Sequence, residues 1–150
     1  MVLLKASGKK WRNIYEMILD TNIIIKHIRK RIEINPRGVV PIVVVGELQA
    51  FALKADWGYQ KILLLESILQ KLPIADIQAE IIPYYAQIDA YSQNALKSTP
   101  LPLKTPRNMG KNDIWIAATA LYYDFELWTN DNDYDHLIPL GLKLIKDEVE

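Results

Sequence analysis

Short apolar runs alternate with segments of helical periodicity from residue 14 to residue 145 of the chain. The expected strands lie at residues 14–19, 39–45, 73–77, 125–128 and 140–145. The expected helices lie at residues 22–32, 46–55, 59–72, 79–96 and 112–124. Strands that alternate with helices favour an α/β fold, in which right-handed crossovers connect a mainly parallel sheet. Ligands bind such sheets beyond the carboxyl ends of the strands, so the residues that follow each strand are the first candidates for function.

The run at residues 39–45 reads Val-Val-Pro-Ile-Val-Val-Val and does not alternate between polar and apolar residues. A β-branched run of this kind is typical of a parallel strand that is buried on both faces. Pro41 lies near its beginning, where a strand tolerates proline best. We therefore expect the strand to continue to Val45 and the next helix to begin at Gly46.

The chain length and composition favour a single domain that spans residues 1–150, with a basic N-terminal extension at residues 1–13. No apolar run approaches the roughly 20 residues that a membrane-spanning helix needs. Lys5 interrupts the apolar start too early for a secretory signal, so we expect a cytoplasmic protein. The absence of cysteine excludes a disulfide framework, a thiol nucleophile and an iron–sulfur cluster. Any metal must therefore be bound by oxygen or nitrogen ligands.

Charge is unevenly distributed along the chain. Residues 1–37 carry nine basic and three acidic side chains, whereas residues 38–150 carry nine basic and fifteen acidic ones. The densest basic stretch, residues 26–31, falls on the first expected helix. This stretch has two interpretations, a surface for an anionic partner or an ordinary solvated helix face.

Acidic residues occur where the expected strands end or where the neighbouring helices begin. They are Asp20, Glu47, Asp113, Asp131 and Asp133. Each residue alone is explained by helix capping or by the helix macrodipole, which is worth roughly 0.3–1 kcal/mol per acidic group. Together they would crowd like charges into one crevice, which opposes folding unless a cation neutralises them. The set therefore predicts a metal site.

Carboxylate oxygens without histidine or cysteine suit Mg²⁺ or Mn²⁺, and Mg²⁺ often bridges protein carboxylates and substrate phosphates. The reaction that fits is phosphodiester hydrolysis, since a dication can activate water and neutralise charge at phosphorus. We expect Asp20, Asp113 and Asp131 to bind the metal directly or through water. Glu47 would bind it or orient the attacking water, and Asp133 is the alternative to Asp131 as the fourth carboxylate.

Short polar residues flank these acids, either to fix the carboxylates and hold a phosphate oxygen or simply to form turns. They are Thr21, Asn22, Thr129 and Asn130.

Residues 97–111 contain three prolines and are expected to form a long loop, a feature that accompanies function or mobility. Basic residues of this loop and of the first helix are candidate contacts for substrate phosphates. They are Arg29, Lys30, Lys104, Arg107 and Lys111.

Four segments carry a pattern in a fixed order along the chain. They are Met-Ile-Leu-Asp-Thr-Asn-Ile at 17–23, Val-Gly-Glu-Leu at 45–48, Asn-Asp-Ile-Trp-Ile-Ala-Ala-Thr-Ala-Leu at 112–121 and Leu-Trp-Thr-Asn-Asp-Asn-Asp-Tyr at 127–134. Together they resemble the PIN-domain ribonuclease family, especially the VapC-like toxins of type II toxin–antitoxin systems. The resemblance spans about residues 14–146, and Tyr134 stands where the family usually has phenylalanine.

This resemblance implies a three-layer α/β fold with a central, mainly parallel sheet of about five strands flanked by helices. It also implies an acidic pocket that binds Mg²⁺ or Mn²⁺ and an endoribonuclease activity on single-stranded RNA. The family's acidic positions match Asp20, Glu47, Asp113 and Asp131. Inhibition by a cognate antitoxin protein and formation of a homodimer are further expectations from the resemblance.

Two other functions fit parts of the pattern. An aspartyl-phosphate phosphatase would use Asp20 as its nucleophile, but such enzymes carry a second Asp two residues later, where this chain has Asn22. A non-catalytic domain would use the acidic cluster for stability and the basic helix for docking RNA or a protein.

His27 and His136 are single and far apart in sequence, so we assign them no role. The four tryptophans are expected in the core rather than on nucleic-acid bases.

Overall fold

The computed structural model describes residues 3–4, 14–102 and 105–147. Within these residues six strands form one sheet in the order β1-β4-β3-β2-β5-β6, and every neighbouring pair is parallel. The strands are β1 (Leu3–Leu4), β2 (Met17–Leu19), β3 (Gly38–Pro41), β4 (Ile74–Ala75), β5 (Glu126–Trp128) and β6 (Leu144–Ile145). The predicted α/β class with a parallel sheet is confirmed, and β1 adds a short edge strand to the five that the sequence indicates.

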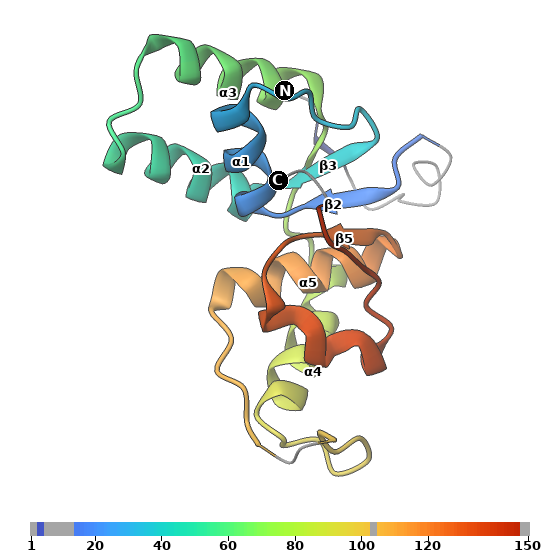
Figure 1. Cartoon of the computed structure of the whole chain (residues 1–150). Coiled ribbons are helices and arrows are strands. Elements are labelled where there is room, and N and C mark those ends of the chain that lie inside the picture. The colour runs from blue at the N-terminus through green and yellow to red at the C-terminus, as the bar shows by residue number, and fades with distance from the viewer. Residues whose placement is uncertain (1–2, 5–13, 103–104, 148–150) are drawn as a thin grey trace.

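The helices of the described residues lie on both sides of this sheet. They are α1 (Thr21–Lys30), α2 (Ile42–Lys54), α3 (Tyr59–Lys71), α4 (Ile82–Ser92) and α5 (Lys111–Tyr123), with 3-10 helices η2 (Ala79–Ile81) and η3 (Asn132–Leu140). Figure 1 shows α1, α2 and α3 on one side of the sheet and α4 and α5 on the other, which is the expected three-layer arrangement. None of these helices is both long and apolar enough to cross a membrane.

The strand predicted at residues 39–45 is wrong in its second half, because α2 already begins at Ile42. The buried residues that recur every four positions in this helix are Val44, Leu48 and Ala52. Burial of this helical face outweighs the weak preference of valine for strands. Glu47 consequently lies in the second turn of α2. The helix macrodipole acts mainly on the first turn, so it does not account for an acidic residue at this position.

The strands β2 and β3 lie close together because residue 38 is glycine. A Cβ atom at Gly38 would lie 2.6 Å from Leu19 Cδ1 and 3.2 Å from the carbonyl oxygen of Asn35. Leu19 is fully buried in a close-packed core and has no room to move aside. Since Leu19 directly precedes Asp20, this tight contact holds the carboxyl end of β2 in place.

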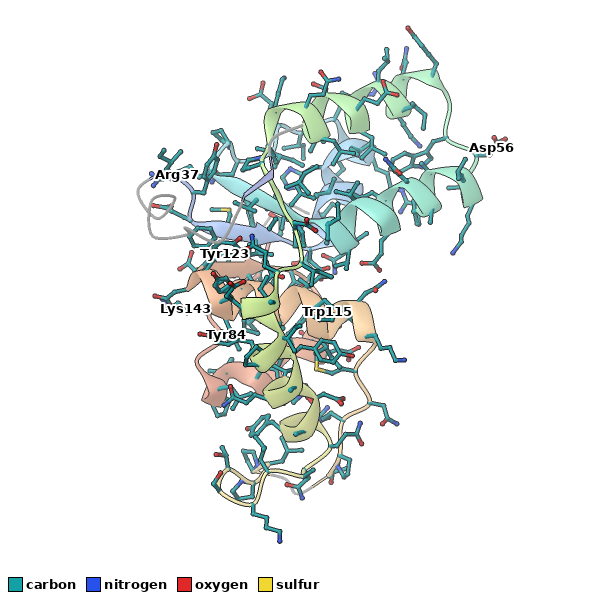
Figure 2. The ribbon with its side chains drawn as sticks, turned by 180° about the vertical axis from the view of Figure 1, so that it is seen from behind. Arg37, Asp56, Tyr84, Trp115, Tyr123 and Lys143 are labelled. Atoms are coloured by element: carbon teal, nitrogen blue, oxygen red, sulfur yellow. The ribbon has the colours of Figure 1, made fainter. Side chains whose placement is uncertain are left out.

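Aromatic side chains join α4 to α5 on the other side of the sheet. The rings of Tyr85 and Trp115 lie 4.2 Å apart, and Figure 2 shows Trp115 and Tyr84 where these two helices meet. The tryptophans that pack against the core are Trp57, Trp115 and Trp128. The prediction of a core role is confirmed for these three, and Trp11 lies outside the described residues.

Candidate active site

Asp20 follows β2 and caps the N-terminus of α1. The residue is only 4% exposed, and its two oxygens accept hydrogen bonds of 2.7 Å from the Thr21 N–H and from Thr129 Oγ1. Burial raises the pKa of Asp20 from 3.8 to about 6, because loss of water disfavours the charged form. The two hydrogen bonds oppose this rise in pKa, whereas the charges of Asp113 and Glu47 add to it.

Glu47 reaches the same place from α2. The hydroxyl of Thr21, the first residue of α1, donates to Glu47 Oε1 at 2.9 Å. Thr21 therefore binds two carboxylates, that of Asp20 through its N–H and that of Glu47 through its hydroxyl. This bridge ties the start of α1 to the second turn of α2.

Asp113 lies in the first turn of α5 and is half-buried. The hydroxyl of Tyr134 donates to Asp113 Oδ1 at 3.0 Å. Burial raises the pKa of Asp113, and the nearby charges of Asp131, Glu47 and Asp133 raise it further, while the bond from Tyr134 lowers it. Burial also raises the pKa of Tyr134, so its hydroxyl stays protonated and keeps its role as a donor.

Asp131 and Asp133 lie in the turn that follows β5. Asp131 caps η3, and its Oδ1 accepts a hydrogen bond of 2.9 Å from the Asp133 N–H. Asp131 is half-buried, whereas Asp133 is exposed. The carboxylates of Asp113, Asp131 and Asp133 each contribute one oxygen to a group in which all three atoms lie within 4.8 Å of one another. We call these three residues the carboxylate cluster.

Thr129, which is fully buried, connects Asp20 to the turn that carries Asp131. Its hydroxyl donates to Asp20 and accepts a hydrogen bond of 3.0 Å from the Asp131 N–H. Asn22 Nδ2 lies 3.5 Å from the same hydroxyl, and Asn22 Oδ1 accepts from the Asn130 N–H at 3.4 Å. The short polar residues are thus part of one network with the carboxylates.

The residues present at this site fit a hard divalent cation. The carboxylate cluster offers only oxygen ligands, and these are the ligands that Mg²⁺ and Mn²⁺ prefer. Asp20 and Glu47 are close enough for their charges to affect the pKa of neighbouring acids. Several like charges in a partly buried site are unfavourable, and a dication would remove that cost.

Two neighbouring grooves extend from the acidic residues along α1 and α2. The first has a volume of about 590 Å³ and is lined by Thr21, Val43, Gly46, Glu47, Ala50, Phe51, Lys54 and Asn112. The second has a volume of about 430 Å³ and is lined by Asn22, Ile25, Lys26, Arg29, Lys30 and Phe51. Phe51 lines both grooves, and the Arg29 guanidinium lies 5.1 Å from its ring centre. The surface thus changes from acidic to basic along α1.

The family model of the PIN domain matches residues 17–138. The chain belongs to the PIN domain family. No curated protein matches the sequence.

Solved structures with this fold include VapBC proteins from several bacteria. VapBC2 from Rickettsia felis, bound to a promoter DNA fragment, is 24% identical, with a TM-score of 0.66 over 87% of this chain and 97% of that chain. DNA-bound VapBC from Salmonella typhimurium is 21% identical, with a TM-score of 0.64 over 88% and 98%. VapBC-5 from Mycobacterium tuberculosis is 21% identical, with a TM-score of 0.58 over 88% and 97%. At these identities the matches establish the PIN fold.

The predicted acids of this PIN domain lie close to one another, but the predicted basic residues do not form one patch. Arg29 and Lys30 line the second groove, away from the carboxylate cluster. Lys111 is the first residue of α5, and Arg107 is exposed on the connection from α4 to α5. Lys104 lies outside the described residues.

Sequence reasoning missed Tyr134 and Lys54 as members of the PIN-domain site. Tyr134 is fully buried and binds Asp113, and its only signal was a tyrosine in place of the family's phenylalanine. Lys54 lines the first groove beside Glu47 because residues seven apart lie on the same face of α2. The helix predicted at residues 46–55 already contained both residues, and this spacing was the signal that could have found Lys54.

Proposed function

We propose that this PIN domain is a metal-dependent endoribonuclease that hydrolyses phosphodiester bonds of single-stranded RNA. The observation that supports this function most strongly is the convergence of Asp113, Asp131 and Asp133, each with one oxygen within 4.8 Å of the others. Asp20 and Glu47 lie close enough for their charges to interact with Asp113. An acidic cluster that served only to stabilise the fold would face an electrostatic cost without compensation. A divalent cation supplies that compensation, and the same cation can bind the phosphate of a substrate.

The carboxylate cluster would hold Mg²⁺ or Mn²⁺, with Asp20 as a further ligand directly or through water. When bound, the ion supplies Lewis-acid stabilisation of the negative charge that develops on the phosphate. Tyr134 binds one oxygen of Asp113, and the Asp133 N–H binds one oxygen of Asp131. These hydrogen bonds orient each carboxylate and leave its second oxygen for the ion.

Glu47 is the residue best suited to accept a proton from the attacking water. Thr21 binds its Oε1, which orients the carboxylate, and the side chain lines the first groove where a substrate can enter. Asp20 is less suited, because it is buried and both of its oxygens accept hydrogen bonds. As Glu47 takes the proton, the water oxygen bonds to phosphorus and the phosphorus–oxygen bond to the leaving ribose breaks. The leaving oxygen takes a proton from solvent water, and Glu47 later returns its proton to solvent.

The two grooves support a single-stranded RNA substrate. Arg29 lies eight residues beyond Thr21 on α1, about 12 Å along the helix axis, so it can bind a phosphate that flanks the scissile one. Phe51 offers an aromatic ring between the acidic and basic ends, and base stacking on such rings does not require a particular sequence. Lys30 and Lys54 add positive charge, and Lys111 and Arg107 are further candidate contacts.

We also propose that the protein is the VapC-like toxin of a toxin–antitoxin pair. One solved structure of the same fold is described as a toxin–antitoxin complex, and another as a member of the VapBC family of toxin–antitoxin systems. A cognate antitoxin, a homodimer and a cytoplasmic location belong to this part of the proposal.

The test of the nuclease function is cleavage of single-stranded RNA by the purified protein with Mn²⁺, and with EDTA in its place. We expect the wild type to cut RNA only with Mn²⁺. We expect Asp113→Asn to cut about 100-fold more slowly or worse, because loss of a group that transfers a proton or stabilises charge typically slows a reaction by at least this factor. Asp124→Asn is the matched control, because Asp124 is exposed at φ 56°, a conformation that asparagine also adopts.

Equal cutting by wild type and Asp113→Asn would contradict the nuclease function. Binding of RNA without cutting by either protein would instead favour a non-catalytic binding domain. A phospho-enzyme trapped on Asp20 would favour the phosphatase.

A further inference from the structure

The last two described residues of the chain bind the turn that carries Asp131. Lys146 Nζ donates to the Asp131 carbonyl oxygen at 3.0 Å, to Asn132 Oδ1 at 3.3 Å and to Asp135 Oδ1 at 3.1 Å. The Asp147 N–H donates to Asn130 Oδ1 at 2.9 Å. Residues 146 and 147 therefore make four hydrogen bonds to the segment at 130–135.

Asp147 also binds α1, the helix that Asp20 caps. Its Oδ2 lies 3.2 Å from His27 Nε2 and 3.3 Å from Lys26 Nζ, and its side chain is 1% exposed. His27 is itself buried, so its contact with Asp147 is shielded from water. The segment at 146–147 thus links α1 to the turn after β5.

This link matters because the candidate metal site is built from separate elements. Asp20 begins α1, and Asp131 and Asp133 lie on the turn at 130–135. The parallel pairing of β2 with β5 aligns the ends of the two strands, but that pairing stops at Leu19 and Trp128. Beyond this point the position of the turn relative to α1 depends on side-chain contacts.

We infer that Lys146 and Asp147 are positioning residues that hold the turn with Asp131 and Asp133 in its metal-binding arrangement. Lys146 acts on the backbone of Asp131 itself, and Asp147 connects the neighbouring Asn130 to α1. The inference rests on the proposed metal-dependent function. Neither residue belongs to the carboxylate cluster, and neither carries out the chemistry.

The test is the affinity of the full-length protein for Mn²⁺ alone, measured by titration calorimetry without RNA. Lys146→Met keeps the aliphatic stem and removes the donor. We expect it to weaken Mn²⁺ binding about 10-fold, the lower end of the effect of removing groups that orient metal ligands. Asp147→Asn is also expected to weaken Mn²⁺ binding. Lys146→Arg keeps a charged donor, so we expect its Mn²⁺ affinity to be close to that of the wild type.

Lys143→Met is the matched control, because Lys143 is an exposed lysine three residues earlier whose ammonium group binds Asp124 rather than the turn at 130–135. We expect its Mn²⁺ affinity to equal that of the wild type. Thermal unfolding of Lys146→Met and Lys143→Met should give the same Tm without metal, which separates positioning of the turn from general stability.

Amide hydrogen exchange gives a second readout that needs no metal. We expect Lys146→Met to exchange faster at residues 130–135 while α5 exchanges as in the wild type. Unchanged Mn²⁺ affinity in Lys146→Met, with a wild type that binds Mn²⁺ and cuts RNA, would overturn this inference alone. A wild type that does not bind Mn²⁺ would overturn the inference together with the metal-dependent function.

Discussion

The hydroxyl of Thr129 donates to Asp20 Oδ2 across 2.7 Å, although the two residues are 109 positions apart in the chain. They meet because Leu19 and Trp128, which precede them, are paired across the parallel strands β2 and β5. The bond is buried, and it supports the most buried of the site's carboxylates. The pairing of β2 with β5 therefore brings Asp20 close to Thr129 and to the turn that follows it.

Thr129→Val should destabilise the protein, because valine keeps the shape of the side chain but leaves a buried carboxylate without its donor. We expect the free energy of unfolding at pH 8 to fall by about 2 kcal/mol, the usual range for a hydrogen bond to a charged group. Urea unfolding measures this change. Thr129→Ser keeps the hydroxyl and should stay closer to the wild type, so equal losses in both variants would argue against the hydrogen bond as the cause.

Stability of the metal-free protein should depend on the ionisation of Asp20. Its pKa is 3.8 in its ordinary state and about 6 in the folded protein, so the folded state binds more protons between these values. The free energy of unfolding should therefore fall as pH rises from about 4 to 6, by up to about 3 kcal/mol, and then level off. The raised pKa of Asp113 acts in the same direction.

The measurement is guanidinium unfolding in EDTA at several pH values between 4 and 8. In Asp20→Asn this part of the pH dependence should disappear, while Asp124→Asn should follow the wild type. A profile for Asp20→Asn that matches the wild type would show that another group causes the pH dependence.

Asp131→Asn should reduce Mn²⁺ affinity more than Asp133→Asn. Both residues belong to the carboxylate cluster, but Asp131 is half-buried and is oriented by the Asp133 N–H, whereas Asp133 is exposed. A half-buried ligand is already ordered and loses less conformational freedom when it binds the ion. Titration of each variant with Mn²⁺ measures the difference, and a larger loss in Asp133→Asn would reverse this assignment.

Tyr134→Phe should weaken Mn²⁺ binding with little effect on the fold. The ring stays in the core, and only the donor to Asp113 Oδ1 is removed. That hydrogen bond lowers the pKa of Asp113, so its loss makes the ionised, metal-binding form less favourable. We expect roughly a 10-fold weaker affinity at pH 7, as for other groups that orient a ligand. Affinity equal to the wild type would mean that Asp113 is oriented without this hydroxyl.

The double variant Arg29→Met with Lys30→Met should raise the KM for single-stranded RNA and leave kcat within about a factor of two. Contacts to phosphates away from the reacting atoms contribute binding energy in the ground state and the transition state alike, so their loss affects KM. Both side chains line the second groove rather than the carboxylate cluster. Steady-state kinetics at two salt concentrations test this, with Lys143→Met as the control. A fall in kcat without a change in KM would place these residues nearer the chemistry than proposed.

Several elements of the fold follow from local sequence patterns. Asp20-Thr21-Asn22 after an apolar run predicts the end of a strand and the start of a helix, and this is where β2 ends and α1 begins. The strand prediction at 39–45 failed in its second half, because a short apolar run without alternation does not by itself distinguish a buried strand from a buried helix. Only the packing of Val44 against the rest of the core distinguishes the two.

Local sequence patterns are enough to predict the alternation of strands and helices, the family and the acids at the strand ends, because each of these depends on neighbouring residues or on short motifs. The three-dimensional fold is needed to show that Tyr134 binds Asp113, that Thr129 binds Asp20, and that Lys146 binds the turn with Asp131. Such contacts depend on distances between residues remote in the chain. Those distances are set by strand pairing and close packing of the core, which no local pattern records.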